Sequence, residues 1–179
     1  LAVQLDALAT LWQPLPPKAE RMLEHALATT RDGLNETRRA LQDLRATPLQ
    51  DLGLALALKH LAQSFTERWE LPLHVDIQDD LGTLAPEIEQ AYYRVAQEAL
   101  DNIARHAQAR AATLTLAREA GRLTLMVSDD GRGITSDADL SADHFGIQGM
   151  RERAALIGGT LDIVARPGQG TTLKLATET

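Results

Sequence analysis

An acidic, glycine-containing segment, Asp129-Asp130-Gly131-Arg132-Gly133, follows alternating apolar residues that are typical of a β-strand. A carboxylate only accepts hydrogen bonds, so Asp129 at the strand end could take one from the exocyclic amine of adenine, whereas the oxygen of guanine would be repelled. Gly131 and Gly133 would let backbone approach a purine without an intervening Cβ. Ordinary turns also contain Asp-Gly pairs, so a purely structural turn is the alternative interpretation.

A second polar group lies on a helix predicted from Pro86 to about His106. Glu98 and Asn102 are four residues apart and share one helix face. The amide oxygen of Asn102 is a hard, neutral ligand for a Mg²⁺ ion that bridges phosphates, and Glu98 could hold its water shell or polarise a nucleophile. One turn further, Arg105 or His106 could contact phosphate oxygens. A solvated polar helix face would use the same residues.

Two glycine-containing segments follow. The first, 145–153, is predicted to be a loop with Gly146 that enters a helix at Gly149, where free N–H groups favour an anion. The second, Gly168-Gln169-Gly170-Thr171, is a tight turn that presents a hydroxyl. Taken singly, both are more typical of ordinary turns and helix starts than of a site.

Several familiar phosphate-binding devices are absent from the sequence. Lysine occurs only at positions 18, 59 and 174 and never follows glycine, which excludes a P-loop. The third glycine of a dinucleotide fingerprint is missing, and there is no His-Glu-x-x-His. A nucleotide would have to be bound in another way.

The elements that position these residues can be predicted from periodicity. Alternation predicts strands over 73–77, 112–117, 123–128, 161–165 and 172–176, and helical spacing predicts helices over about 54–69, 86–106 and 149–157. A polar stretch over 133–144 is predicted to be a loop. Helices and a largely antiparallel sheet in mixed order indicate an α+β sandwich.

The N-terminal stretch has coiled-coil spacing instead. A heptad seam steps 4-3-4-3-4-3 along a segment rich in helix formers, and an earlier apolar stripe ends at the prolines of 14–17. The seam consists of Leu23, Leu27, Thr30, Leu34, Thr37, Leu41 and Leu44. Such a helical hairpin either packs on its own globular part or pairs with a second copy into a four-helix bundle, and we favour the bundle.

Composition limits the function further. The 179 residues suffice for one domain with a helical arm, and 18 basic against 25 acidic residues give a net charge of −7, the opposite of what phosphate neutralisation in a nucleic-acid binder requires. The absence of cysteine excludes disulfides and thiol catalysis. No apolar stretch approaches the roughly 18–20 residues that span a bilayer, so we expect a chain without membrane contact. Because it begins at Leu1 rather than Met, we expect further sequence upstream.

In this order, the four motifs resemble the ATP-binding domain shared by histidine kinases, gyrase, Hsp90-type chaperones and MutL. Asn102 matches the N box, 129–133 the G1 box and 146–149 the G2 box. The strings Gln97-Glu98-Ala99-Leu100 and Gly149-Met150-Arg151-Glu152-Arg153, and Leu52-Gly53-Leu54 entering a helix, are similar to the nitrate-sensor (NarX/NarQ, DesK-like) class of histidine kinases.

The resemblance implies a helical hairpin over 1–50, left from a dimerisation and histidine-phosphotransfer domain, and an ATP-binding catalytic domain over 51–179. It implies a protein-histidine kinase of a two-component system that moves the ATP γ-phosphoryl to a histidine and onward to an aspartate of a response regulator. It also implies a homodimer, and a cytoplasmic portion of a membrane-anchored parent.

The site residues are carried over by position. Asp129 would recognise adenine, Asn102 would coordinate Mg²⁺, and Glu98 would assist the metal or the nucleophile. Arg105 and His106 would meet phosphates, and Thr171 would touch the nucleotide. The glycines would shape the pocket and its lid, the lid being the loop over 134–145; they are Gly131, Gly133, Gly146 and Gly149.

One departure from the family concerns the phosphoacceptor, which is a His followed by Asp or Glu. None of the five histidines, at positions 25, 60, 74, 106 and 144, has that neighbour. We therefore expect the acceptor to lie upstream, so that these residues bind ATP without phosphorylating themselves. A nucleotide-sensing module without transferase activity is the alternative. The gyrase and chaperone branch is disfavoured, because its further domain after the ATP site has no counterpart here.

Overall fold

The computed structural model describes residues 47–133 and 144–179. The chain divides into two compact units, Leu1–Thr47 and Pro48–Thr179, and the second is described here by itself. The predicted helical hairpin and its heptad seam, and most of the predicted loop and lid, lie outside the described residues.

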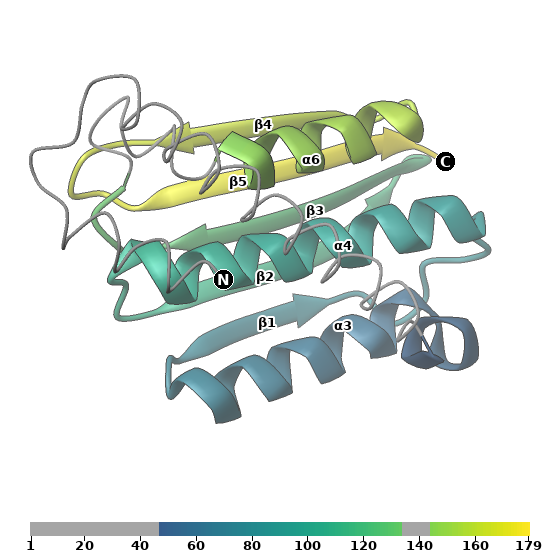
Figure 1. The fold of residues 1–179 in the computed structure, drawn as a ribbon. Helices are drawn as coiled ribbons and strands as arrows, with labels where there is room; N and C mark the ends of the chain where they lie inside the picture. Colours follow the sequence, from purple (N-terminus) through teal and green to yellow (C-terminus); the bar gives the residue numbers. More distant parts are fainter. Residues whose placement is uncertain (1–46, 134–143) are drawn as a thin grey trace, which may run out of the picture. The chain divides into compact units, whose positions relative to one another are not determined.

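The second unit consists of helices on one face of a five-stranded sheet (Figure 1). In chain order the elements are α3 (Thr47–Trp69), β1 (Leu73–Ile77), α4 (Pro86–Asn102), the π-helix η1 (Ile103–Ala107), β2 (Ala112–Glu119), β3 (Arg122–Asp129), α6 (His144–Leu156), β4 (Thr160–Ala165) and β5 (Thr171–Glu178). The predicted α+β class is confirmed, as is the position of each of the five predicted strands.

The strand order is β1-β2-β3-β5-β4. β1 and β2 are parallel and are connected by α4 and η1, whereas the other neighbouring pairs are antiparallel. Asp129, the last residue of β3, pairs with Ala112, the first residue of β2, and β5 begins beside it at Thr171. The segment from η1 leads into the start of β2. Its residues therefore lie near the start of β2, the end of β3 and the start of β5, which are all at the same end of the sheet.

The core is aliphatic, with few aromatic side chains. Its fully buried large residues come from α3, α4, α6 and the three central strands: Leu54, Leu58, Tyr92, Val95, Leu100, Leu114, Leu116, Leu123, Leu125, Met150 and Leu175. The hydroxyl of Tyr92 donates to the carbonyl of Leu123 at 2.7 Å, which ties α4 to β3, and burial raises the pKa of Tyr92 well above its ordinary value. The apolar face of α4 thus fixes this helix on the sheet.

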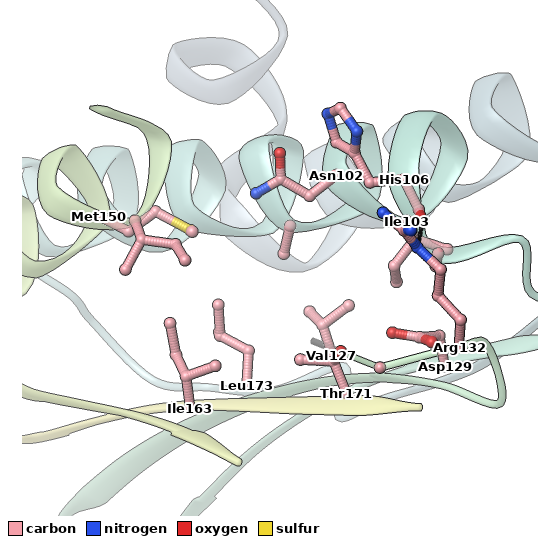
Figure 2. A pocket seen from close by; sticks show the side chains of 14 residues that line it. Asn102, Ile103, His106, Val127, Asp129, Arg132, Met150, Ile163, Thr171 and Leu173 are labelled. Carbon is pink, nitrogen blue, oxygen red and sulfur yellow. Dashed lines mark hydrogen bonds between the residues drawn. The ribbon is translucent and has the colours of Figure 1, made fainter. Parts of the chain in front are cut away.

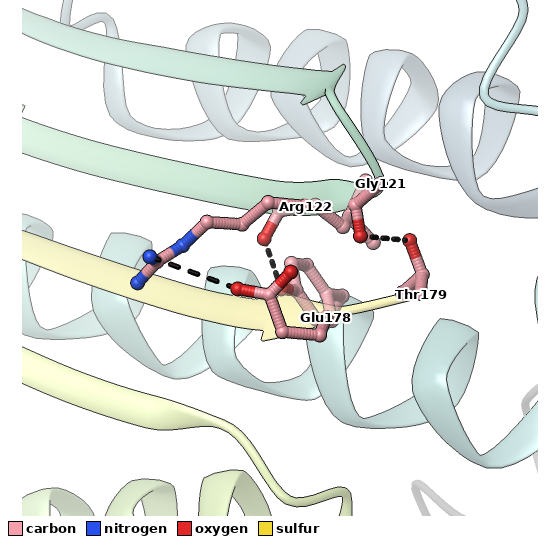
Figure 3. A network of polar contacts seen from close by, with 6 residues as sticks. Gly121, Arg122, Glu178 and Thr179 are labelled. Atoms are coloured by element: carbon pink, nitrogen blue, oxygen red, sulfur yellow. Dashed lines mark hydrogen bonds and ion pairs between the residues drawn. The ribbon is translucent and has the colours of Figure 1, made fainter.

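At the opposite end of the central strands, the end of β5 contacts the start of β3 (Figure 3). The backbone N–H of Thr179 donates to the carbonyl of Gly121 at 2.6 Å, and Arg122 and Glu178 form an exposed ion pair at 3.7 Å. These contacts hold β5 against the β2–β3 turn, at the end of β3 remote from Asp129.

Two helix boundaries differ from the sequence prediction. The loop predicted before residue 54 is only a kink, because Gly53 (φ 73°, ψ 169°) interrupts a helix that already begins at Thr47. The last helix begins at His144 rather than at Gly149, so the predicted loop over 145–148 is wrong. Ile147, Met150 and Ala154 share the face that packs into the core, and this burial outweighs the low helix propensity of the two glycines.

None of the helices in the described part of the chain is long and apolar enough to cross a membrane.

Candidate functional site

A pocket opens between the end of α4 and the strand ends (Figure 2). Its walls are mostly apolar side chains from both layers, with polar groups around them. The lining residues are Ala99, Asn102, Ile103, His106, Ala107, Val127, Asp129, Arg132, Gly133, Ile147, Met150, Ile163, Thr171 and Leu173. Apolar walls with a few convergent polar groups suit a ligand with an apolar ring and polar substituents.

Asp129 is the acidic group on the strand side of this pocket (Figure 2). Its carboxylate accepts the backbone N–H of Gly131 at 2.8 Å and that of Thr171. Burial raises the pKa of the Asp129 carboxyl above its ordinary value of 3.8, the two N–H donors oppose that rise, and the neighbouring charge of Asp130 adds to it. A half-buried acceptor held in place by two backbone donors is suited to reading a hydrogen-bond donor on a ligand.

The loop after Asp129 is packed tightly between two other backbone segments. A Cβ on Gly131 would clash with the carbonyl oxygen of Ala107 in η1, and a Cβ on Gly170 would clash with the carbonyl oxygen of Asp129. The two glycines therefore let protein backbone approach protein backbone, and Gly131 does not itself line the pocket. The sequence predicts that Gly131 permits close approach of a purine, whereas the structure places the backbone of η1 there.

Asn102 and His106 lie on the helix side of the pocket (Figure 2). Asn102 is the last residue of α4, and η1 begins at the next residue. A π-helix closes its hydrogen bonds from i to i+5 and holds more residues per turn than an α-helix. Arg105 is accordingly turned further from Asn102 than α-helical spacing predicts, and it is exposed and does not line the pocket.

Glu98 lies one turn before Asn102, where α6 crosses α4. A Cβ built on Gly146 would lie 2.5 Å from Oε1 of Glu98 and 3.8 Å from Nδ2 of Asn102, so both side chains reach the same point on α6. The Asn102 atom nearest this point is the amide nitrogen, so its amide oxygen is directed elsewhere. Carboxylate and amide oxygens are the ligands that Mg²⁺ takes in proteins, and Glu98 and Asn102 carry one of each on neighbouring turns of α4. In residues 47–133 and 144–179, no group of three or more His, Asp or Glu could hold a metal without help from a ligand.

The structure thus brings together half of the predicted site residues. Asn102, His106, Asp129, Gly133 and Thr171 line the pocket. The others lie outside its lining: Glu98 and Gly146 contact each other, Gly149 is buried within α6, Gly131 packs on η1, and Arg105 is exposed.

Sequence reasoning missed the apolar walls and Arg132. Val127, Leu173 and Ile163 are alternating strand residues, and Met150 is nearly two turns into α6, so each has the pattern of an ordinary core residue. Arg132 stood within the acidic motif itself and was not singled out, because a single arginine between glycines has no spacing that indicates a role.

An α+β sandwich whose pocket combines apolar walls, a strand-end carboxylate and a helix-end amide is typical of a nucleotide-binding domain. Comparison with protein families agrees with this class. Residues 87–178 match the model of histidine kinase-, DNA gyrase B- and HSP90-like ATPases, and residues 1–49 match a histidine kinase model. The chain belongs to this ATPase family, as the catalytic region of a sensor histidine kinase, and the family implies that the domain binds ATP.

Individual relatives and structural neighbours are also histidine kinases. The chain is 33% identical over 158 residues to the sensor histidine kinase LiaS of Bacillus subtilis, covering 88% of this chain and 42% of LiaS. The blue-light activated histidine kinase of Erythrobacter litoralis shares its fold, with a TM-score of 0.63 and 23% identity over 86% of this chain and 51% of that one. Full-length ShkA in complex with AMPPNP gives a TM-score of 0.58 at 19% identity, over 85% of this chain and 38% of ShkA.

The chain spans less than half the length of the curated relatives LiaS, MctS and DegS. These relatives, together with the match of residues 1–49 to the histidine kinase model, support the nitrate-sensor class of histidine kinases to which the motifs are similar.

The packing of Gly131 gives a prediction on stability. Gly131→Ala should destabilise the domain by about 1–3 kcal/mol, because the added methyl must displace the backbone of η1. Gly149→Ala is the matched control, since its Cβ would meet nothing closer than 3.5 Å and alanine favours the helix interior. Urea unfolding of both variants measures the difference, and equal midpoints would contradict the account of Gly131.

Proposed function

We propose that this chain binds Mg-ATP in the pocket between Asp129 and Asn102 and positions the γ-phosphoryl for transfer to a histidine of a dimerisation helix, from which it passes to a response-regulator aspartate. One observation carries the proposal: the carboxylate of Asp129 and the amide of Asn102 line one pocket from opposite layers of the fold. A nucleotide that spans the pocket would use both.

The purine end is supported by the chemistry of Asp129. The carboxylate would accept the exocyclic amine of adenine, while Val127, Leu173, Ile163 and Met150 would enclose the ring. Guanine would place an oxygen against the same carboxylate, and two acceptors repel each other. The complex of the structurally similar ShkA with AMPPNP, an ATP analogue, supports the choice of an adenine nucleotide.

The phosphate end is supported by the end of α4. Asn102 and Glu98 would hold Mg²⁺ together with phosphate oxygens and water, and His106 would contact the phosphates. The ion would neutralise phosphate charge during transfer. Phosphoryl transfer depends on positioning of the nucleotide and electrostatic stabilisation of its phosphates. The pocket residues would contribute to both.

The acceptor and partners follow from the same proposal. We infer that the accepting histidine belongs to a dimerisation helix outside these 179 residues, since none of the five histidines is followed by Asp or Glu. Membership of the histidine kinases implies a dimer and a response regulator. We further propose that the dimer forms through the hairpin over 1–50, ahead of a catalytic domain over 51–179, and that these residues act in the cytoplasm as part of a membrane-anchored sensor.

Removal of the Asn102 amide tests the metal end. Asn102→Ala should abolish the increase in ATP-analogue affinity that Mg²⁺ produces, because the neutral oxygen ligand is lost, while the fold is retained. Isothermal titration with and without Mg²⁺ measures this, and Gln90→Ala, an exposed substitution on α4, is the control. An unchanged Mg²⁺ effect would reject the ligand role of Asn102.

Replacement of the Asp129 carboxylate tests the purine end. Asp129→Asn should weaken ATP binding by about 1–3 kcal/mol, because a charged hydrogen bond in a half-buried site is lost. Wild-type protein should prefer ATP over GTP, and the variant should lose that preference; Asp162→Asn, exposed on β4, should leave both affinities unchanged. Equal binding of ATP and GTP by the wild type would remove the assignment.

The raised pKa of Asp129 adds a pH signature to the same measurement. Only the ionised carboxylate is a pure acceptor, so ATP affinity should fall on acidification, and it should begin to fall above the pH at which an ordinary aspartate with pKa 3.8 titrates. Asp130, Arg132 and His106 lie nearby, so the comparison is made in a His106→Gln background. The Asp129 contribution is the part of the profile that Asp129→Asn removes.

Transfer itself separates a kinase from a nucleotide-sensing module. With Mg-ATP, the chain should phosphorylate an added helical fragment that carries the His-Asp or His-Glu motif of the class, and the product should be acid-labile. ATP binding without any phosphorylated fragment, at fragment concentrations high enough for helix pairing, would favour the sensing module.

A further inference from the structure

The second aspartate of the motif has a different task from the first. Asp130 does not line the pocket; its Oδ1 accepts the backbone N–H groups of Arg110 at 2.7 Å and Ala111 at 2.9 Å. Its own N–H donates to the carbonyl of Ala111 at 3.3 Å. These hydrogen bonds, from Ala111 and Arg110, hold the pKa of the Asp130 carboxyl below its ordinary value. The carboxylate is therefore engaged by the backbone that leads from η1 into β2.

Arg132 binds the same stretch of chain from the other side of Gly131. Its backbone N–H donates to the carbonyl of Ala107 at 2.8 Å, and its Nε donates to the carbonyl of His106 at 2.8 Å. Its carbonyl accepts the N–H of Gly168 at 2.7 Å, in the β4–β5 turn. Figure 2 shows the arginine side chain rising from the strand layer toward η1.

Both residues thus attach the Asp129 loop to residues 106–111, and Gly131 between them lies against Ala107. This stretch continues directly from η1, and η1 continues directly from Asn102. The connection between Asn102 and the Asp129 loop is therefore short. It consists of the π-turn η1 and the following residues up to 111, which contact three consecutive loop residues, 130–132. π-Turns are rare and are often found at functional sites.

We propose that Asp130 and Arg132 are positioning residues that clamp the Asp129 loop to residues 106–111 and thereby fix the spacing between the purine-binding carboxylate and the metal-binding amide. The inference rests on the proposed function of the pocket and assigns the two residues no contact with the reacting atoms.

Loosening the clamp should affect a ligand that spans the pocket more than a ligand that binds at one end, which a general loss of stability would not do. A ligand held at both ends gains affinity because binding at one end raises the effective concentration at the other, and this gain depends on the spacing of the two sites. Loosening the clamp should weaken Mg-ATP, which spans the pocket. It should spare adenosine, which uses only the Asp129 end, and Mg-tripolyphosphate, which uses only the Asn102 end.

The experiment compares these three ligands on the 179-residue chain by NMR titration. Asp130→Ala should weaken Mg-ATP by about tenfold, while the affinities for adenosine and Mg-tripolyphosphate stay within about twofold of wild type. Asp130→Asn keeps an Oδ1 acceptor and should restore Mg-ATP binding to within about twofold. Arg132→Lys keeps the charge but loses Nε–H, and it should weaken Mg-ATP at least about threefold; because Arg132 lines the pocket, the single-end ligands are compared in the Asp130 variants only.

Asp80→Ala is the matched control, because Asp80 also accepts a backbone N–H, that of Gly82 at 2.9 Å, in the loop before α4. It should leave all three affinities unchanged. Amide hydrogen exchange without nucleotide should accelerate in 106–111 for Asp130→Ala and not for Asp130→Asn.

Three results would overturn the clamp. They are an equal loss of adenosine and Mg-ATP affinity in Asp130→Ala, an Asp130→Asn variant as weak as Asp130→Ala, or unchanged Mg-ATP affinity in both Asp130→Ala and Arg132→Lys. Failure of the proposed function would look different, since wild-type protein would then bind no Mg-ATP while the exchange difference between the two Asp130 variants persisted.

Discussion

The structure depends on the close approach of three backbone segments at one end of the three central strands. The loop after β3 touches η1 at Ala107 on one side and the β4–β5 turn on the other, and only glycine fits at Gly131 and Gly170. This contact brings the last residue of β3 beside the first residues of β2 and β5 and under the end of α4. The pocket is the space that remains above this junction, so its polar groups are positioned by backbone rather than by long side chains.

This arrangement explains why adjacent residues have different tasks. Asp129 ends a strand and points into the pocket, where burial raises its pKa, whereas the next residue points out and binds two backbone N–H groups. The alternation of a β-strand places them on opposite sides. On the helix side, the π-turn after Asn102 keeps His106 at the pocket and turns Arg105 away from it. The different orientations of these neighbouring side chains thus follow from local backbone geometry.

The strands and α4 could be predicted from sequence because each has a clear period and a buried face. The pair Asp129 and Asn102 could be predicted because their chemistry is specific and their elements were identified correctly. The start of α6 could not, since its glycines indicate a loop and only the burial of Ile147, Met150 and Ala154 makes it a helix. The roles of Gly131, Asp130 and Arg132 could not be predicted either, because each depends on contacts with residues 19 or more positions away in the chain, and periodicity carries no information about such contacts.

The most direct test of the central claim is a crystal structure of the chain with AMPPNP and Mn²⁺ in place of Mg²⁺, located by anomalous scattering. The account predicts the adenine amine within hydrogen-bond distance of the Asp129 carboxylate and the manganese peak next to the Asn102 amide oxygen, in one continuous ligand. A nucleotide bound elsewhere, or a metal remote from Asn102 while the adenine sits at Asp129, would contradict it.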